Sequence, residues 1–172
     1  MQGEKTNMKI VFIGPDGAGK STIAKEWSEK FDMPIIENDY REEDKLSKMH
    51  EYLNLDNIIF DRLFYPDHLI YSKIKGVELS EEELGAWGDL RLLLPFKNIA
   101  YVYVTAPDEL LYERLHKRGD DYIEFEDIPK IKQGYEEILK DFPVPVMTLV
   151  SQEDYTYKIG GFSFGINKHL PS

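Results

Sequence analysis

The feature that most constrains this chain is a glycine-rich loop, residues 14–21, between an apolar run and a helical pattern. Its sequence, GPDGAGKS, fits the pattern G-x-x-x-x-G-K-[ST]. Residues 8–13 before it are apolar and rich in β-branched side chains, which is typical of a buried strand. Because glycines let backbone N–H groups converge and a helix N-terminus adds partial positive charge, the loop predicts a binding site for phosphate groups.

Each residue type in this loop has a physical use. Lys20 is expected to reach the β- and γ-phosphates of a nucleoside triphosphate, and the Ser21 hydroxyl to ligate Mg²⁺. The expected cofactor is therefore Mg²⁺, with ATP as the co-substrate. The full set of residues expected to bind ATP is Gly14, Asp16, Gly17, Ala18, Gly19, Lys20, Ser21 and Thr22.

Strand and helix patterns alternate along the rest of the chain. Strands are expected at residues 8–13, 34–37, 58–61, 99–105 and 144–150. Helices are expected at residues 20–31, 42–53, 65–75, 80–94, 108–118 and 127–141. Ser80 and Glu83 form a capping box, and Asp108 is expected to cap the next helix. This alternation predicts a three-layer α/β/α fold of the P-loop NTP-binding type with a five-stranded parallel sheet.

Charge and composition restrict the partners. The formal net charge of −11 argues against a nucleic-acid partner, because an acidic surface repels phosphate backbones. The chain has no cysteine, so neither a disulfide nor a thiolate metal site can form. No stretch resembles a signal peptide or a membrane span, so we expect a cytoplasmic protein without a membrane partner. A homodimer stays open.

Charged residues follow the expected strands at the edge where parallel sheets bind their ligands. Asp61 is expected to hold Mg²⁺ or its water shell, and the planar fork of Arg62 to grip an acceptor phosphate. An ordinary salt bridge between them is the alternative. Glu37, after the second strand, would contact metal or acceptor, or simply be solvated. Tyr71 would line a nucleobase pocket or pack in the core.

Three segments together resemble the thymidylate kinase family of nucleoside monophosphate kinases. They are the phosphate loop with its acid at Asp16, the Asp61-Arg62 pair, and the sequence RLHKRGDDYIE at residues 114–124. Tyr135 also resembles a tyrosine that these enzymes carry in the following helix. The similarity spans roughly residues 8–150. It implies an adenylate/thymidylate kinase-like fold and ATP-dependent transfer to a deoxynucleoside monophosphate, dTMP or a related pyrimidine, forming the diphosphate.

The resemblance also implies roles for individual residues. A lid near residues 114–125 would close over the donor phosphates and supply arginines, which makes Lys20, Arg62, Arg114 and Arg118 the expected catalytic set. A solvated helix face is the alternative for the last two. Asp16 would reach the 3′-hydroxyl of the acceptor sugar, unless it only shapes an Asx-turn. The expected acceptor-binding set is Asp16, Glu37, Arg62 and Tyr71.

The sequence departs from that family where the base is read. Thymidylate kinases carry Arg-Glu-Pro after the second strand, where this chain has ENDYR at residues 37–41, and a tyrosine where it has Leu63. Glu37 keeps open a nucleoside or other small-molecule kinase, in which a carboxylate takes a proton from a hydroxyl acceptor. A non-catalytic nucleotide-binding module, gripping a partner through its C-terminal tail, is a third alternative.

The length of 172 residues suits one domain. We expect an N-terminal extension at residues 1–7, the kinase domain with its lid at residues 8–151, and a C-terminal extension at residues 152–172. The tail contains GGFSFG, whose alternating glycines and aromatics fit either a hairpin or a partner-binding segment.

Overall fold

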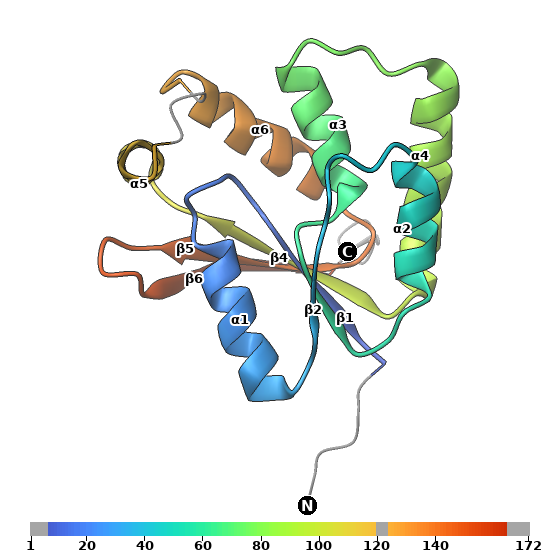
Figure 1. The fold of residues 1–172 in the computed structure, drawn as a ribbon, viewed down its shortest axis with the longest axis horizontal. Helices are drawn as coiled ribbons and strands as arrows, with labels where there is room; N and C mark the ends of the chain where they lie inside the picture. The colour runs from blue at the N-terminus through green and yellow to red at the C-terminus, as the bar shows by residue number, and fades with distance from the viewer. Residues whose placement is uncertain (1–6, 120–123, 165–172) are drawn as a thin grey trace, which may run out of the picture.

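A computed structural model of the chain describes residues 7–119 and 124–164 (Figure 1). The strands are β1 (Lys9–Ile13), β2 (Ile35–Glu37), β3 (Ile58–Asp61), β4 (Ile99–Thr105), β5 (Pro145–Ser151) and β6 (Tyr157–Phe164). The helices are α1 (Lys20–Phe31), α2 (Lys45–Leu53), α3 (Phe64–Ile74), α4 (Glu81–Leu93), α5 (Asp108–Lys117) and α6 (Asp127–Leu139), with a 3₁₀ turn at Leu94–Phe96.

The strands form one sheet in the order β2-β3-β1-β4-β5-β6. Strands β1 to β5 are parallel, which confirms the predicted five-stranded parallel sheet. Strand β6 is antiparallel to β5 and makes the sheet mixed. Residues 157–164 therefore complete a hairpin, as one of the two readings of the tail predicts, and residues 165–172 of the expected extension lie outside the described residues.

Helices cover both faces of the sheet, as expected for strands that are apolar on both sides (Figure 1). On one face, Ile23 of α1 and Leu111 of α5 pack in one apolar cluster. On the other, Trp87 of α4 and Tyr135 of α6 share a second cluster with residues of α2 and α3. The three-layer α/β/α prediction is confirmed. No described helix is long and apolar enough to cross a membrane.

The helix starts show where local sequence rules were sufficient. The capping box at the start of α4 is present, because the Ser80 hydroxyl accepts from Glu83 N and the Glu83 side chain accepts from Ser80 N. The expectation that Asp108 caps α5 is wrong. Pro107 occupies the cap position, and the Asp108 carboxylate lies 2.7 Å from Lys132 Nζ on α6. The Asp108 carboxylate thus forms an ion pair with a distant helix instead of capping its own helix, as the local sequence had predicted.

Candidate active site

The phosphate loop joins β1 to α1 at the carboxyl end of the sheet. Gly14, with φ 139°, is packed so tightly that an added Cβ would lie 2.0 Å from the Val104 carbonyl oxygen of β4. Gly17 and Gly19 have φ 87° and 92°, which side chains rarely adopt. Three of the loop's positions therefore require glycine for backbone reasons, before any ligand is considered.

Lys20 is the first residue of α1 and is buried against the loop. Its Nζ donates a 2.9 Å hydrogen bond to the Pro15 carbonyl. Burial lowers the pKa of Lys20 to about 8, while the carboxylates of Asp67 and Asp61 oppose this shift. The positive charge of this ammonium is only partly compensated, because its hydrogen-bond partner is a neutral carbonyl. Negatively charged phosphate oxygens at the loop would be better partners for it.

Ser21 and Asp61 come together, as expected for the proposed metal ligands. The Ser21 hydroxyl donates a 2.5 Å hydrogen bond to Asp61 Oδ2 across the end of β3. Among the described residues, no group of three or more His, Cys, Asp or Glu side chains is arranged to hold a metal ion. A pair of oxygen donors fits Mg²⁺, which commonly takes one or two protein ligands and completes its shell with phosphates and water.

Arg62 follows β3 in an unusual backbone conformation, with φ 72°. Its N–H donates to the Phe12 carbonyl at 2.8 Å, which continues the pairing of β3 with β1. Asn38, after β2, holds the other side of this turn: its Nδ2 donates to the Arg62 carbonyl and its Oδ1 accepts from Phe64 N at 3.2 Å. Asn38 thus fixes the direction in which Arg62 leaves the sheet, a role that sequence reasoning missed.

The Arg62 guanidinium lies between two carboxylates. It forms an ion pair with Asp16 of the phosphate loop, and its Nη1 is 3.6 Å from Asp67 Oδ2 on α3. The Tyr71 ring lies beside it, with its centroid 5.9 Å from Arg62 Cζ. The alternative of a salt bridge between Asp61 and Arg62 is not what forms, since Asp61 bonds Ser21 and Arg62 pairs elsewhere.

Asp67 is a second residue that sequence reasoning missed. Its side chain has no solvent exposure, and its oxygens accept hydrogen bonds from Tyr135 Oη at 2.8 Å and Tyr40 Oη at 2.9 Å. Burial raises the pKa of Asp67, and the nearby Arg62 charge opposes that rise. An acidic residue on a helix is usually solvated at the surface. The only hint in the sequence was that this acid lies five residues after the Asp61-Arg62 pair, and that hint is weak.

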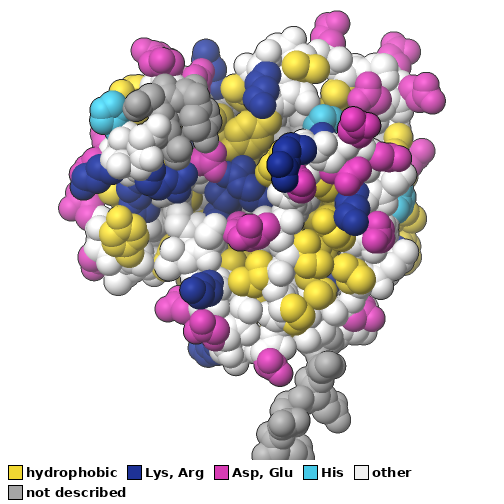
Figure 2. All heavy atoms as spheres, viewed as in Figure 1, with side chains coloured by type: hydrophobic (Ala, Val, Ile, Leu, Met, Phe, Trp, Pro, Cys, Tyr) yellow, Lys and Arg dark blue, Asp and Glu magenta, His cyan; other side chains and the backbone are white. Residues whose placement is uncertain are grey.

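Two adjoining hollows meet at these residues. A cleft of about 290 Å³ over the loop is lined by Asp16, Gly17, Gly19, Lys20, Ser21, Thr22, Glu37, Asn38, Asp61, Arg62 and Arg118. A cavity of about 770 Å³ shares Asp16 and Arg62 with it and extends past Tyr40, Asp67 and Tyr71. Figure 2 shows Lys and Arg side chains gathered near the middle of this face, where Figure 1 draws the start of α1. Acidic side chains are spread more widely.

Nearly all the predicted site residues lie in one of these two hollows. Glu37 is exposed at the end of β2 and lines the cleft, and Tyr71 lines the larger cavity. Gly14 and Ala18 are in the loop but buried, and neither lines the cleft. Arg118, the C-cap residue of α5, lines the cleft together with Lys20. Residues 120–123 of the expected lid lie outside the described residues.

Arg114 is not placed as a lid arginine would be. It is 8% exposed, and its guanidinium donates to the carbonyls of Gly17 and Gln152 and to the Ser151 hydroxyl, at 3.1, 2.7 and 3.0 Å. Its Cζ also lies 4.4 Å from the centroid of the Tyr155 ring. Because its guanidinium donates to three protein acceptors, Arg114 connects α5 to the phosphate loop and to the β5–β6 hairpin. It does not face the cleft as a lid arginine would.

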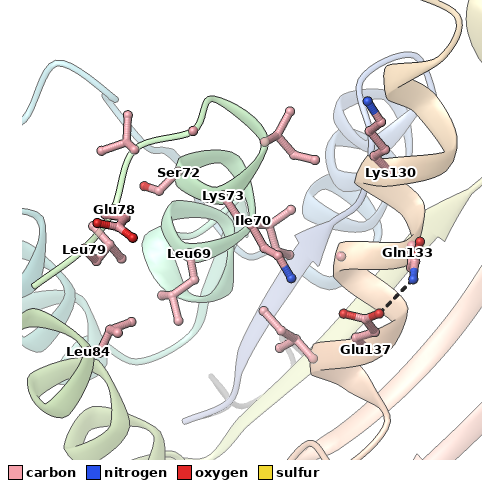
Figure 3. Close-up of a pocket in the computed structure, with 15 residues that line it drawn as sticks. Leu69, Ile70, Ser72, Lys73, Glu78, Leu79, Leu84, Lys130, Gln133 and Glu137 are labelled. Atoms are coloured by element: carbon pink, nitrogen blue, oxygen red, sulfur yellow. Dashed lines mark hydrogen bonds between the residues drawn. The ribbon is translucent and has the colours of Figure 1, made fainter. Parts of the chain in front are cut away.

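A third hollow, of about 710 Å³, lies on the other side of α3, between α3, α4 and α6 (Figure 3). Apolar side chains such as Leu69, Ile70 and Leu84 make up much of its wall, and Gln133 Nε2 donates to Glu137 Oε1 at 2.9 Å on α6. It shares no lining residue with the phosphate cleft. It does share Ser72, Ile74 and Val77 with the 770 Å³ cavity, so it adjoins the candidate active site, although none of the predicted site residues lines it.

Fold and site together define a P-loop protein with a cleft built for nucleotide phosphates. No family model matches the chain. Over 138 residues it is 31% identical to YorR, an SPbeta prophage-derived uncharacterized protein of Bacillus subtilis strain 168, with 77% of this chain and 82% of YorR covered. The chain therefore belongs to the family of YorR.

Solved structures agree with this assignment. A crystal structure of YorR in complex with phosphorylated GDP matches with a TM-score of 0.67 and 28% identity, over 86% of this chain and 90% of that chain. Deoxyadenosine kinase from M. mycoides matches with a TM-score of 0.58 and 24% identity, over 87% and 92% of the two chains. The second likeness shows the shared fold. The narrower resemblance to thymidylate kinases stays a prediction.

Proposed function

We propose that this protein transfers the terminal phosphoryl group of a purine nucleoside triphosphate to a deoxynucleoside monophosphate, dTMP or a related pyrimidine nucleotide. The observation that carries the proposal is the position of Arg62, which lines both the phosphate cleft and the larger cavity. Transfer between two phosphates needs cations on both sides, because charge repulsion must be neutralised as they approach. Lys20 and Arg118 serve the donor, and Arg62 serves the acceptor.

The donor would lie along the phosphate loop. Lys20 Nζ would exchange its Pro15 carbonyl for β- and γ-phosphate oxygens, and Arg118 would approach from the end of α5. Ser21 and Asp61 would hold Mg²⁺, which neutralises phosphate charge when bound. ATP is the donor expected from the sequence. Because YorR was crystallised with phosphorylated GDP, GTP is an equally important donor to test.

The acceptor would occupy the larger cavity with its phosphate on Arg62. That phosphate would take the place of Asp16 on the guanidinium, while Asp67 keeps Arg62 in position from the other side. Asp16, once released, would accept a hydrogen bond from a sugar hydroxyl. An oxygen of the acceptor phosphate then attacks the γ-phosphorus, the bond from the γ-phosphorus to its bridging oxygen breaks, and two nucleoside diphosphates result.

One observation favours a second function. The Glu37 carboxylate is exposed, lines the cleft and has no hydrogen bond or ion pair with the described residues. Such a group would serve as the general base for a hydroxyl acceptor, as in a nucleoside kinase. In that case Arg62 would orient the substrate without neutralising an acceptor phosphate.

Product analysis tests the proposal. The protein is incubated with Mg²⁺, ATP or GTP, and in turn thymidine, deoxycytidine and the four common deoxynucleoside monophosphates, and products are identified by mass. The proposal predicts a diphosphate from a pyrimidine monophosphate, and Lys20→Ala should abolish it. Monophosphates formed from nucleosides, without diphosphates, would replace the proposal by the hydroxyl-acceptor function. No product from any pair would contradict both.

A further inference from the structure

The turn end of the β5–β6 hairpin lies against the back of the phosphate loop. Tyr157, the first residue of β6, donates a 3.0 Å hydrogen bond from its hydroxyl to the Gly19 carbonyl. Its ring packs against the apolar cluster that includes Ile23 and Leu111. The hydroxyl is thus held by a partly buried ring on a strand of the central sheet.

This hydrogen bond constrains the orientation of one peptide group. The Gly19 carbonyl accepts from Tyr157 on one side and from Ile23 N, at 3.2 Å, in the first turn of α1. In a trans peptide the carbonyl of one residue and the N–H of the next point in opposite directions. Fixing the Gly19 carbonyl toward the hairpin therefore directs the Lys20 N–H away from it, to the side of the cleft that Gly19 and Lys20 line.

The approach of strand and loop is unusually close. A Cβ added to Gly19 would lie 2.7 Å from the Tyr157 hydroxyl oxygen, nearer than real Cβ atoms come to other atoms. Position 19 therefore needs glycine for its φ of 92° and also for the space that Tyr157 occupies. The two residues are adjacent in space although 138 positions separate them in the chain.

We propose that Tyr157 is a positioning residue for the donor phosphates, acting through the Gly19–Lys20 peptide group. The inference rests on one part of the proposed function, namely that a nucleotide binds at this loop. A loop held in its binding conformation before the ligand arrives loses less freedom on binding, so the hydrogen bond strengthens nucleotide affinity. The contact does not change between ground state and transition state, so it affects the KM of the donor and leaves kcat nearly unchanged.

The test is Tyr157→Phe, which removes the hydroxyl and keeps the ring packed. Calorimetry at 25 °C measures the Kd of ADP, GDP and pyrophosphate, the last of which probes the loop without a base. We expect each Kd to rise about fivefold to tenfold, as for the loss of one neutral hydrogen bond. The KM of the acceptor should stay within about twofold. Tyr155→Phe is the matched control, because that ring is on the same hairpin and 63% exposed.

Unchanged Kd values in Tyr157→Phe, or an equal loss in Tyr155→Phe, would overturn the inference, as would a lowered melting temperature with normal Kd values. If the wild-type protein bound none of the three probes, the donor site itself would be wrong, and the inference with it. If it bound them with the expected difference but transferred nothing to any acceptor, the proposed reaction would fail while Tyr157 kept its role.

Discussion

The Arg62 Nη1 lies 3.6 Å from the Oδ2 of Asp67, a carboxylate with no solvent exposure. Tyr135 and Tyr40 donate to the same carboxylate, so both of its oxygens are occupied. Asp67 therefore holds the guanidinium from the side of α3, and under the proposed function Asp16, which lines the phosphate cleft, is the partner that an acceptor phosphate would replace. This arrangement distinguishes a residue that fixes Arg62 from one that an acceptor phosphate replaces.

The first prediction concerns Asp67. Asp67→Asn keeps the shape but removes the charge opposite Arg62, so the guanidinium loses its fixed position. We expect the KM of the acceptor to rise by about tenfold or more, because removing one partner of a buried ion pair leaves the other charge uncompensated. The KM of the donor at pH 7 should change by less than about threefold. Steady-state kinetics with each substrate varied in turn measures both values.

Tyr135→Phe provides a graded control, because it removes one hydrogen bond to Asp67 and leaves the charge in place. Its effect on the KM of the acceptor should be smaller and in the same direction. Equal increases in both KM values for Asp67→Asn would show that the carboxylate serves the donor as much as the acceptor. No change in either would leave Asp67 with a structural role.

The second prediction separates two arginines on one helix. Arg114→Ala should lower the free energy of unfolding by about 2–3 kcal/mol, because it leaves the carbonyls of Gly17 and Gln152 without their donor. Arg118→Ala, at an exposed position, should leave stability within about 0.5 kcal/mol and lower kcat by tenfold or more. Denaturant unfolding and kinetics on both variants measure the difference. A stable Arg114→Ala protein with low kcat would restore Arg114 to the lid.

The third prediction concerns pH. The pKa of Lys20 is about 8 in the free protein because burial disfavours its charge. Bound phosphates would favour the charged form and raise that pKa, so above pH 8 binding must take up a proton. Nucleotide affinity should therefore be flat below about pH 8 and fall, by up to about tenfold per unit, as pH rises above it. Lys20→Ala should bind weakly and without this dependence.

Calorimetry from pH 7 to 9.5, in buffers of different ionisation enthalpy, measures both the affinity and the proton uptake. Constant affinity across this range, with no proton taken up, would mean that Lys20 stays charged in the free protein. The loop would then bind phosphate without the linkage described above.

Much of the fold followed from local patterns. The apolar runs of β1 and β4 and the capping box at Ser80 are signals that burial and helix chemistry impose on neighbouring residues. Strand β6 was ambiguous because Gly160 and Gly161 interrupt its alternation, and its pairing register with β5 skips Gly160 opposite Thr148 and Leu149. The cap assigned to Asp108 failed because Lys132, far along the chain, competes for its carboxylate.

The site divides in the same way. The meeting of Ser21 with Asp61 and of Asp16 with Arg62 was foreseeable, because the ends of parallel strands share one edge. The roles of Asp67 and Tyr157 could not be foreseen, because they depend on hydrogen-bond partners that lie far away in the chain. Arg114 was misassigned for a related reason: the resemblance to thymidylate kinases implied a lid arginine, but in the last turn of α5 the side chain turns inward to the phosphate loop and the hairpin.

The most direct test compares dTMP with thymidine as acceptors, using Mg²⁺ and the better of ATP and GTP. If Arg62 neutralises an acceptor phosphate, kcat/KM for dTMP should exceed that for thymidine by at least about tenfold, equivalent to about 1.4 kcal/mol of transition-state stabilisation. Arg62→Ala should remove most of that preference, while Glu37→Gln should leave it intact. Equal or faster turnover of thymidine, lost in Glu37→Gln, would contradict the monophosphate-kinase account and establish a hydroxyl acceptor.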